Sequence, residues 1–248
     1  MNEKPNSIPA GDGSTIRVLH YDVIDSTNLE AKRKIKSGAK LPFVIVADTQ
    51  TAGKGRMGRK FFSPSKTGLY MSFVYEPKTS IQDSVTVTSA AAVAVVRAIE
   101  ELTDLKPKIK WVNDIYIDNK KVSGILTEAV TGEKTTIIIG IGVNITTDDF
   151  PDEIQDVATS LKQSVDKNIL LECIVKHLVE LINGLPQRTF LPEYKEKSIV
   201  IGKEVYFIKD GISKEGMAVD INQDGALIVE TAKGFETLST GEITLRVK

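Results

Sequence analysis

The sequence is poor in the residues that build disulfide frameworks and metal sites. It contains a single cysteine, Cys173, so no intrachain disulfide can form and a cysteine-based metal site is excluded. Only two histidines are present, which argues against a histidine-rich metal site. A globular protein without a disulfide framework is expected in the cytoplasm.

Long apolar segments and a strong excess of one charge are also missing. The longest apolar runs, residues 90–96 and 137–143, are far shorter than the roughly 20 residues that a membrane-spanning helix needs, so no membrane association is expected. Residues 1–14 contain no apolar stretch typical of a signal peptide. Lys and Arg together number 32 and Asp and Glu 33, a net charge of −1. A protein devoted to binding nucleic acid is therefore not expected, and any positive site must be local.

What the sequence does contain is typical of a globular protein of the α+β class. Its 248 residues are 41% hydrophobic and 26% charged, enough for one large domain or for one large and one small domain. We expect residues 1–14 to be a frayed start and the acidic segment 148–156 to be a solvated loop. Apolar patterning predicts strands at Thr15–Val23, Phe43–Ala47, Leu69–Tyr75, Lys108–Val112, Ile115–Ile117, Val122–Val130 and Thr135–Val143, and helices at Leu29–Lys36, Val85–Thr103 and Asn168–Leu185.

The pattern changes near residue 190. Pro186 and Pro192 bracket a connector, and after Lys197 the chain contains only short strand patterns separated by glycine-containing turns. The predicted strands are Glu204–Ile208, Gly216–Asn222, Ala226–Thr231, Glu236–Ser239 and Ile243–Val247. Five short strands in succession predict a small barrel of the SH3-like type. We therefore divide the chain into a first domain of residues 1–195 and a C-terminal domain of residues 196–248.

Gly53–Lys60 is the most informative segment, because three glycines alternate with four cations and no acid. Glycine permits positive φ and close approach of a ligand to the backbone, and the cations offer charge-assisted hydrogen bonds to phosphate or carboxylate. The segment matches the pattern G-x-G-x-x-G, but no helix pattern follows it, as a dinucleotide-binding loop would require. We interpret it as an anion-binding loop rather than as a basic surface turn.

Three further segments place polar groups or glycines within strands. Lys110–Asp114 combines a cation, an amide and a carboxylate, which suit phosphate, a purine edge and Mg²⁺ respectively, although Asn-Asp is also a common turn pair. We expect Trp111 in this segment to belong to the core. Lys121–Leu126 begins with a cation at the mouth of a strand and contains Gly124, which indicates either a close ligand or a β-bulge. Gly140–Asn144 contains two glycines, which predict a flat wall against a ligand.

In this order, the segments resemble those of the biotin protein ligase family. The resemblance covers nearly the whole chain, from Ile24 to Arg246. The matching segments are Asp25–Asn28, Gln50–Arg59, Lys110–Asp114, Lys121–Leu126, Gly140–Asn144 and Gly241–Arg246. The resemblance implies a catalytic domain with a mixed sheet, related to class II aminoacyl-tRNA synthetases, followed by a small SH3-like domain.

The resemblance also implies a reaction in two steps. The carboxylate of biotin attacks the α-phosphate of ATP, which yields biotinyl-5′-AMP and pyrophosphate, and a lysine of a biotin carboxyl carrier protein then displaces AMP. Arg56, Lys121 and Lys110 are implied to act in catalysis, and Asp114 to bind Mg²⁺. The residues implied to bind biotin or its adenylate are Ser26, Thr27, Asn28, Gln50, Gly53, Lys54, Gly55, Arg56, Asn113, Lys121, Gly124, Ile125, Gly140, Gly142 and Asn144.

The main alternative is a lipoate or octanoate ligase of the same fold. Ser26, Thr27 and Gln50 favour biotin, because these polar groups suit its ureido ring. A catalytically inactive binding protein is the second alternative, and the retained cations Arg56 and Lys121 argue against it.

The sequence departs from the family pattern at three positions. Val112 stands where proline is usual, Lys54 where arginine is usual, and Phe61 where tryptophan is usual. None of these changes removes a charge that the reaction requires. Too few residues precede Ser26 for the DNA-binding helix-turn-helix domain of some members, so we expect no DNA binding. The expected protein partner is a biotin carboxyl carrier domain, and assembly as a homodimer is left open.

Overall fold

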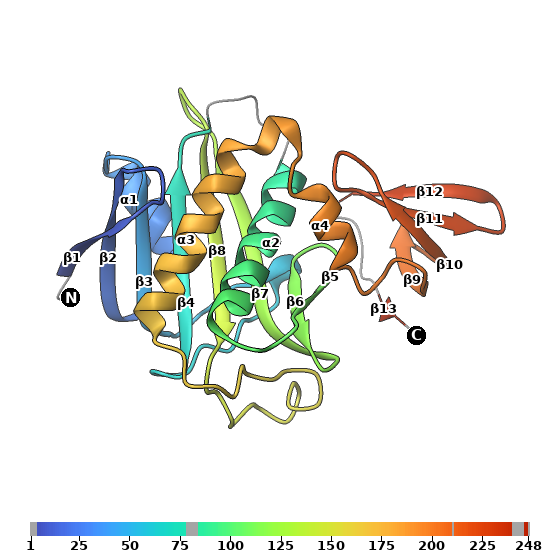
Figure 1. Ribbon diagram of the computed structural model, residues 1–248, viewed down its shortest axis with the longest axis horizontal. Coiled ribbons are helices and arrows are strands. Elements are labelled where there is room, and N and C mark those ends of the chain that lie inside the picture. The colour runs from blue at the N-terminus through green and yellow to red at the C-terminus, as the bar shows by residue number, and fades with distance from the viewer. Residues whose placement is uncertain (1–3, 78–83, 210, 240–245, 248) are drawn as a thin grey trace.

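The computed structural model describes residues 4–77, 84–209, 211–239 and 246–247. Its larger part is built on an eight-stranded sheet with the order β1-β2-β3-β4-β8-β7-β6-β5 (Figure 1). The strands are β1 (Lys4–Pro9), β2 (Thr15–Ile24), β3 (Phe43–Gln50), β4 (Gly68–Tyr75), β5 (Lys108–Lys110), β6 (Asp114–Ile117), β7 (Lys120–Val130) and β8 (Thr136–Asn144). β2 and β3 run parallel and the other neighbouring strands run antiparallel, so the sheet is mixed, as expected.

Helices cover both faces of this sheet, because its central strands are apolar on both sides. They are α1 (Thr27–Lys36), α2 (Ser84–Leu102), α3 (Lys167–Asn183) and α4 (Leu191–Glu196). Val44 and Val46 of β3 pack into the core cluster that α2 and α3 share. Phe43 and Ile45 point the other way, into a cluster that contains Ala31 of α1. This alternation follows from the two-residue period of a strand. Figure 1 shows α2 and α3 running across one face of the sheet.

The predicted strands and helices of this part are confirmed, with ends that differ by a few residues, but two segments contain structure that is not expected from the sequence. Lys4–Pro9 forms the edge strand β1 instead of a frayed start, and the expected connector contains a 3₁₀ turn, Leu185–Gln187, as well as α4. Proline hides the structure of both segments from sequence patterns. Pro5 and Pro9 are tolerated in β1 because it lies at the sheet edge, and Pro192 is tolerated in the first turn of α4.

The C-terminal part is an antiparallel sheet of five strands in the order β12-β11-β10-β9-β13. The strands are β9 (Glu204–Lys209), β10 (Ile212–Ile221), β11 (Leu227–Thr231), β12 (Gly234–Leu238) and β13 (Arg246–Val247). The predicted strand Ile243–Val247 and the segment Gly241–Arg246 lie outside the described residues, apart from the two residues of β13. The small all-β unit is therefore confirmed, whereas the division between residues 195 and 196 stays a prediction.

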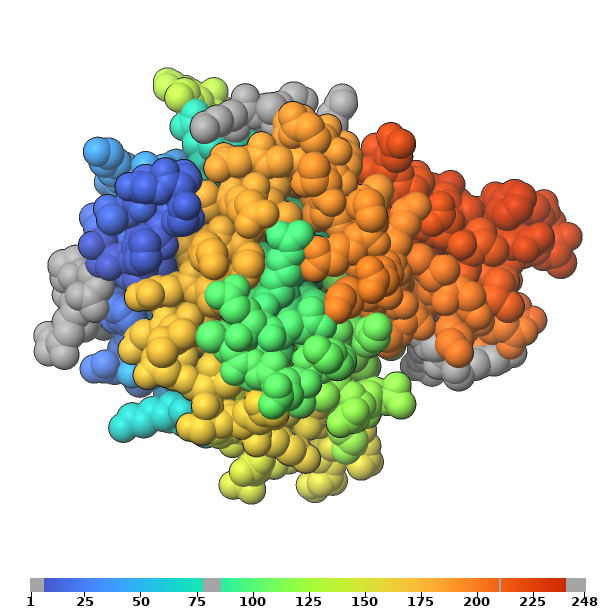
Figure 2. Space-filling model, viewed as in Figure 1, coloured from blue at the N-terminus to red at the C-terminus, as the bar shows by residue number. Residues whose placement is uncertain are grey.

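Apolar packing and polar contacts join the two parts. Phe207 of the C-terminal sheet belongs to the same apolar cluster as Trp111 of the larger part. Trp111 Nε1 donates a hydrogen bond of 2.9 Å to the carbonyl oxygen of Gly225. In space-filling view, the C-terminal part projects from one end of the larger body (Figure 2). In the described part of the chain, no helix is both long enough and apolar enough to cross a membrane.

Candidate functional site

A cavity of about 320 Å³ lies between the segment Gly53–Lys60 and strands β7 and β8. All but one of the predicted site residues line this cavity, and Gly53 is the exception. The predicted residues that line it are Ser26, Thr27, Asn28, Gln50, Lys54, Gly55, Arg56, Lys110, Asn113, Asp114, Lys121, Gly124, Ile125, Gly140, Gly142 and Asn144. Segments far apart in the sequence thus meet at one place, while the role of each residue stays a prediction.

Neutral polar groups form one end of the cavity, at the start of α1. Thr27 donates to Oε1 of Gln50 twice, from its backbone nitrogen at 2.8 Å and from Oγ1 at 3.2 Å. Gln50 Nε2 in turn donates to Ser63 Oγ at 2.9 Å. Ser26 is the N-cap residue of α1, but its side chain makes no capping hydrogen bond. The bonds between Thr27, Gln50 and Ser63 set the orientation of Thr27 and Gln50 before a ligand binds. The Ser26 hydroxyl is not used in the helix cap.

The protein itself holds the side-chain amide of Asn28. Asn28 Nδ2 donates to Glu128 Oε2 at 2.8 Å and to Leu126 O at 3.3 Å. Its Oδ1 accepts a hydrogen bond of 2.6 Å from Ser72 Oγ. A Cβ atom at Gly140 would lie 2.4 Å from Asn28 Oδ1, so the missing side chain there makes room for the amide. This geometry favours a supporting role for Asn28 in the cavity wall over direct binding of a ligand.

The basic segment Gly53–Lys60 folds as a small hairpin with one 3₁₀ turn at its tip, and it does not open a helix. Phe61 N donates to Gly53 O at 2.9 Å, where the two arms meet the body of the protein. Closer to the tip, Gly55 N donates to Arg59 O at 2.7 Å. The rejection of a dinucleotide-binding loop is therefore confirmed, because such a loop must lead into a helix.

The glycines of the hairpin serve two different purposes. Gly58 has a φ of +73°, and it follows Met57, whose φ is +55°. Gly58 adopts this conformation without strain because it has no Cβ atom, whereas Met57 does not. Gly53 has no room for a side chain, because a Cβ atom there would lie 2.6 Å from the carbonyl oxygen of Phe61.

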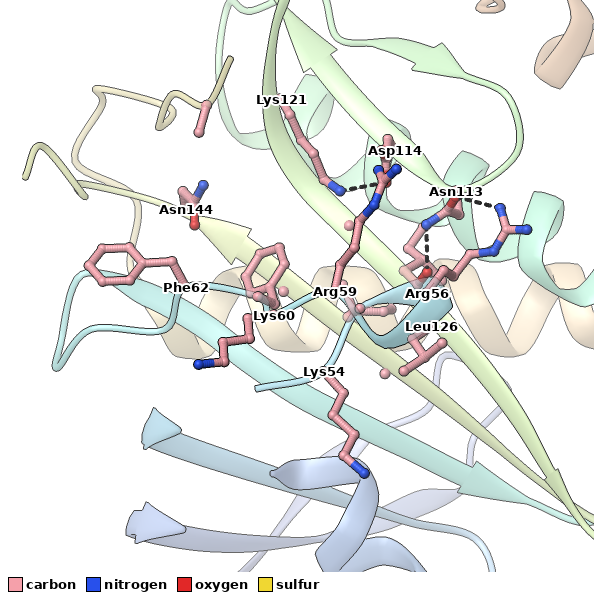
Figure 3. Close-up of a pocket in the computed structure, with 18 of the residues that line it drawn as sticks. Lys54, Arg56, Arg59, Lys60, Phe62, Asn113, Asp114, Lys121, Leu126 and Asn144 are labelled. Atoms are coloured by element: carbon pink, nitrogen blue, oxygen red, sulfur yellow. Dashed lines mark hydrogen bonds and ion pairs between the residues drawn. The ribbon is translucent and has the colours of Figure 1, made fainter. Parts of the chain in front are cut away.

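The cations of the hairpin point in different directions (Figure 3). Arg56 Nη1 donates to Asn113 Oδ1 at 3.0 Å, and Asn113 Nδ2 donates to Ile125 O at 2.9 Å. Burial lowers the pKa of Arg56, against the opposing effect of Asp114, yet a guanidinium group stays charged at neutral pH. Lys54 points away from this group. Arg56 is thus fixed to β7 through Asn113 while its charge faces the cavity.

A second group of cations surrounds Asp114. Lys121 Nζ forms an ion pair of 2.7 Å with Asp114 Oδ1. Its side chain passes over Gly124, where a Cβ atom would lie 3.1 Å from Nζ. Lys110 Nζ lies 5.4 Å from the ring centroid of Tyr116. Burial lowers the pKa of Lys110, Asp114 opposes this shift, and the charge of Lys121 adds to it. The glycine predicted to admit a ligand therefore makes room for Lys121 as well.

The expected wall of glycines in β8 lies at the cavity and also makes room for side chains of the protein. Gly140 faces the amide of Asn28, and a Cβ atom at Gly142 would lie 2.3 Å from Cε1 of Phe61. The Phe61 ring also packs edge-on against Tyr70, with ring centroids 6.4 Å apart. Both glycines line the cavity, but the space that they leave is taken by the protein's own side chains.

The turn before Asn113 rests on buried groups from distant elements. Trp111 is 6% exposed and belongs to the core, as expected. The hydroxyl group of Tyr194, which is fully buried in α4, donates to Val112 O at 2.9 Å. Because α4 is absent from the sequence prediction, this support of the site was not foreseen either.

The segment after β8 closes another side of the cavity. Asn144 Nδ2 donates to Thr159 O at 3.0 Å, while its Oδ1 is buried without a hydrogen-bond partner in the described part of the chain. The acids of the expected solvated loop, such as Asp152, are exposed, but Phe150 and Ile154 of the same loop line the cavity. Apolar residues within an otherwise acidic loop are the signal that could have revealed this contribution.

Sequence reasoning left several lining residues unassigned. They are Met57, Arg59, Lys60, Phe61, Phe62, Met71, Trp111, Tyr116, Leu126, Ile141, Phe150, Ile154, Val157 and Ala158. Arg59 and Lys60 matter most for the chemistry, because they extend the positive charge of the hairpin. Six cations thus line the cavity, namely Lys54, Arg56, Arg59, Lys60, Lys110 and Lys121. Asp114 is the only carboxylate among the described lining residues, so the cavity suits an anion with several charges.

Comparisons with known proteins agree with this arrangement. Residues 21–144 match the model of the biotin/lipoate A/B protein ligase family, and residues 200–246 match that of the biotin protein ligase C-terminal domain. The chain is 34% identical over 241 residues to the bifunctional ligase/repressor BirA of Bacillus subtilis, a match that covers 92% of this chain and 74% of that protein. It is 28% identical over 250 residues to the biotin–[acetyl-CoA-carboxylase] ligase of Mycobacterium tuberculosis, which covers 94% and 91% of the two chains.

Solved structures include one with a similar fold and bound ligands. The biotin protein ligase from Aquifex aeolicus in complex with biotin and ATP superposes with a TM-score of 0.82 and 30% sequence identity. The match covers 93% of this chain and 99% of that one.

Proposed function

Since this chain belongs to the biotin/lipoate A/B protein ligase family, we propose a role for each group of residues in its cationic cavity. The chain is a biotin protein ligase, with the activity of a biotin–[acetyl-CoA-carboxylase] ligase. The match of residues 200–246 to the C-terminal domain of biotin protein ligases favours biotin over the lipoate and octanoate of other family members.

The observation that carries the assignment is the charge distribution of the cavity, which is lined by six cations, with Asp114 as the only carboxylate among the described lining residues. The first step joins two anions, the biotin carboxylate and the α-phosphate of ATP. Arg56 and Lys121 offset their repulsion and stabilise the charge that develops on the α-phosphoryl group. Lys110 and Arg59 bind the remaining phosphates. The lysine amine of the carrier then displaces AMP, so the reaction needs no nucleophile from this chain.

The neutral end of the cavity is assigned to the ureido ring of biotin. Thr27 and Gln50 are held together by hydrogen bonds, and Ser26 keeps its hydroxyl out of the helix cap. Hydroxyl and amide groups pair well with a ring that carries both N–H donors and a carbonyl acceptor. Asn113 and Asn144 are assigned to the adenine and phosphate side, where Asn144 Oδ1 lacks a hydrogen-bond partner in the described part of the chain.

Lys121 changes partner in this proposal. Without substrate its Nζ is paired with Asp114 Oδ1 at 2.7 Å, and the side chain of Lys121, which lines the cavity, is 31% exposed. The biotin carboxylate would take over this contact, and later the acyl phosphate would do so. Asp114 therefore holds Lys121 in place until the substrate arrives.

The residues fit a Mg²⁺ ion that is held mainly by the nucleotide. Mg²⁺ is commonly bound by one or two carboxylates together with substrate phosphates and water. The lining offers one such carboxylate, Asp114, and its Oδ1 already contacts Lys121. Asp114 would thus supply at most a small part of the coordination sphere, and the ion would serve to neutralise phosphate charge.

The protein partner is inferred from the activity. The lysine that receives biotin would lie on the biotin carboxyl carrier domain of a carboxylase, as the name of the Mycobacterium tuberculosis relative indicates for that enzyme. Because ATP and such a carrier are cytoplasmic, we place the reaction in the cytoplasm.

Exchange of pyrophosphate into ATP tests the proposed chemistry directly. We expect exchange that depends on biotin and Mg²⁺ and that is weak or absent with lipoate or octanoate. Faster exchange with lipoate or octanoate than with biotin would contradict the assignment of the neutral end to a ureido ring. Transfer of biotin to a carrier domain, measured by mass spectrometry, tests the second step.

A further inference from the structure

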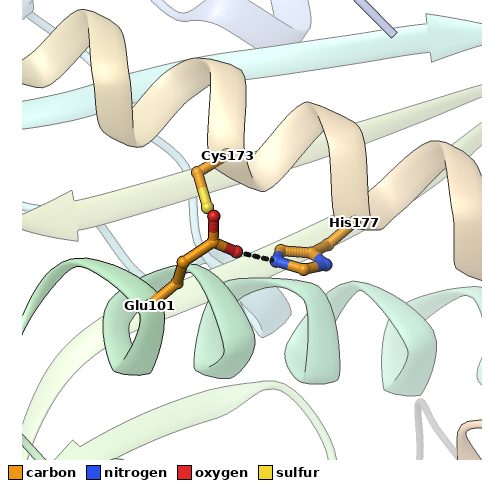
Figure 4. A group of neighbouring side chains, drawn as sticks. All are labelled: Glu101, Cys173 and His177. Carbon is orange, nitrogen blue, oxygen red and sulfur yellow. Dashed lines mark hydrogen bonds and ion pairs between the residues drawn. The ribbon is translucent and has the colours of Figure 1, made fainter. Parts of the chain in front are cut away.

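A group of three side chains with metal-binding chemistry lies between α2 and α3 (Figure 4). Glu101 belongs to α2, and Cys173 and His177 belong to α3. Glu101 Oε2 lies 2.8 Å from His177 Nε2, and one donor atom of each residue lies within 4.8 Å of the other two. None of the three is among the described residues that line the ligase cavity.

Helix geometry brings these groups together. Cys173 and His177 are four residues apart on α3, so they lie on the same face, one turn from each other. That face packs against α2, near its C-terminal end, where Glu101 extends between the two side chains (Figure 4). Cys173 is 6% exposed, whereas the side chain of Glu101 is 47% exposed, which gives an ion access from solvent.

We propose that Glu101, Cys173 and His177 bind a divalent transition-metal ion of the zinc class, with water at the fourth position. Thiolate, imidazole and carboxylate are all ligands of Zn²⁺ in proteins, at roughly 2.0–2.3 Å. Donors at those bond lengths around a tetrahedral ion lie roughly 3.3–3.8 Å apart. The distance between Glu101 Oε2 and His177 Nε2 must therefore lengthen slightly, and the longest distance between donor atoms must shorten. The half-exposed carboxylate of Glu101 can move to accommodate both changes.

His177 Nδ1 adds an independent indication. This atom is buried and has no hydrogen-bond partner in the described part of the chain, and Glu180 Oε2 lies 3.9 Å from it. Histidines that bind metal through one nitrogen commonly donate the other N–H to a carboxylate. Glu180 is held nearby through Arg97, whose Nη1 lies 3.3 Å from Glu180 Oε1. A small shift would complete the carboxylate–histidine–metal arrangement.

Two groups oppose binding. Lys176 Nζ lies 3.5 Å from Glu101 Oε1, in an ion pair that is exposed and therefore weak. The Cys173 thiol must also give up its proton to solvent when the ion binds, because the thiolate is the form that binds a metal.

The proposal refines the conclusion that one cysteine excludes a metal site. That argument applies to sites with several cysteines, whereas a mixed site needs only one. Bound metal would join α2 to α3, which pack into the core on the same face of the sheet. It would stabilise the fold in proportion to its affinity for the folded chain.

Metal titration of the reduced, chelator-treated protein tests the site. Co²⁺ should produce a thiolate-to-metal charge-transfer absorption band, and because the chain has one cysteine that band can only come from Cys173. Zn²⁺ should displace Co²⁺ at one ion per chain and raise the melting temperature. Cys173→Ser should abolish the band, and His177→Gln should weaken Zn²⁺ binding by more than the 10–100-fold that is typical for loss of an outer-shell partner.

Lys176→Ala is the matched control on α3. It removes the exposed ion pair with Glu101 and leaves the three ligands, so Zn²⁺ should bind at least as tightly as in the wild type. The proposal is overturned if the wild type shows no thiolate-to-Co²⁺ band, or if Cys173→Ser and His177→Gln, checked for folding by circular dichroism, bind Zn²⁺ as the wild type does. Pyrophosphate exchange with Mg²⁺ supplied should be the same with and without Zn²⁺ at this site, so this test is independent of the ligase assignment.

Discussion

Lys121 holds a charge that the protein neutralises only until a substrate arrives. Its Nζ is paired with Asp114, and its side chain is 31% exposed. We predict that Lys121→Ala lowers biotin-dependent pyrophosphate exchange by roughly 10²–10³, the usual effect of losing one donor to a developing charge. The melting temperature should stay near that of the wild type, because a cation at a cavity mouth buries little apolar surface.

Arg56→Ala should have an effect of similar size, and the double variant should lose less than the sum of the two losses, since both cations act on one charge. Lys36→Ala, an exposed cation at the end of α1, is the control and should exchange at the wild-type rate. Lys60 is unsuitable as a control because it lines the cavity. Wild-type exchange by a folded Lys121→Ala protein would remove Lys121 from the mechanism.

Asn28 is predicted to matter for stability more than for contact with biotin. It is 3% exposed and bonds to Ser72 and Glu128, so Asn28→Ala leaves buried polar atoms without partners. We expect the free energy of unfolding in urea to fall by about 1–3 kcal/mol. Asn168→Ala, an exposed asparagine in the first turn of α3, should change it by less than about 0.5 kcal/mol. Unchanged stability of Asn28→Ala, together with a large loss of biotin affinity, would instead make Asn28 a direct ligand.

At the scale of elements, the hairpin Gly53–Lys60 is the part most open to change on binding. Much of it is exposed, it carries four cations that repel one another, and few backbone hydrogen bonds join its arms. We predict that its amide hydrogens exchange more slowly once biotin and ATP are added, because the anions draw the cations together and the hairpin closes over them. Mass spectrometry of peptides after deuterium labelling measures this.

Peptides from α3 provide the internal reference for that experiment. One side of α3 is buried and none of its residues lines the cavity, so its protection should be high and independent of ligand. Equal protection of the hairpin with and without ligands would contradict closure.

At the scale of the whole molecule, Trp111 reports on the contact between the two parts. It is the sole tryptophan, it is buried, and its Nε1 donates to Gly225 O of the C-terminal part. Because the two parts share an apolar cluster, we predict that they unfold together. Tryptophan fluorescence and far-ultraviolet circular dichroism should give one coincident transition in urea. A fluorescence transition at clearly lower urea would show that the parts separate before either unfolds.

Much of the architecture could be predicted because secondary structure follows local patterns. The apolar spacing of Asn168–Leu185 predicts a helix, and α3 occupies Lys167–Asn183. The clustering of glycines and cations in Gly53–Lys60 predicts an anion site, and the cavity lies beside that segment. The elements that escaped prediction, β1 and α4, contain proline, whose tolerance depends on position at a sheet edge or in a first helical turn.

The sequence by itself determined the types of most elements, the small C-terminal β unit and the chemistry of the site, since these depend on neighbouring residues and on side-chain type. Only the tertiary structure decided which groups share a space. Asn28 meets Glu128, 100 residues away, because α1 packs beside the neighbouring strands β4, β8 and β7. The same packing fills the room at Gly142 with Phe61. Such contacts depend on strand order and helix packing, and neither is encoded in the spacing of residues along a single segment.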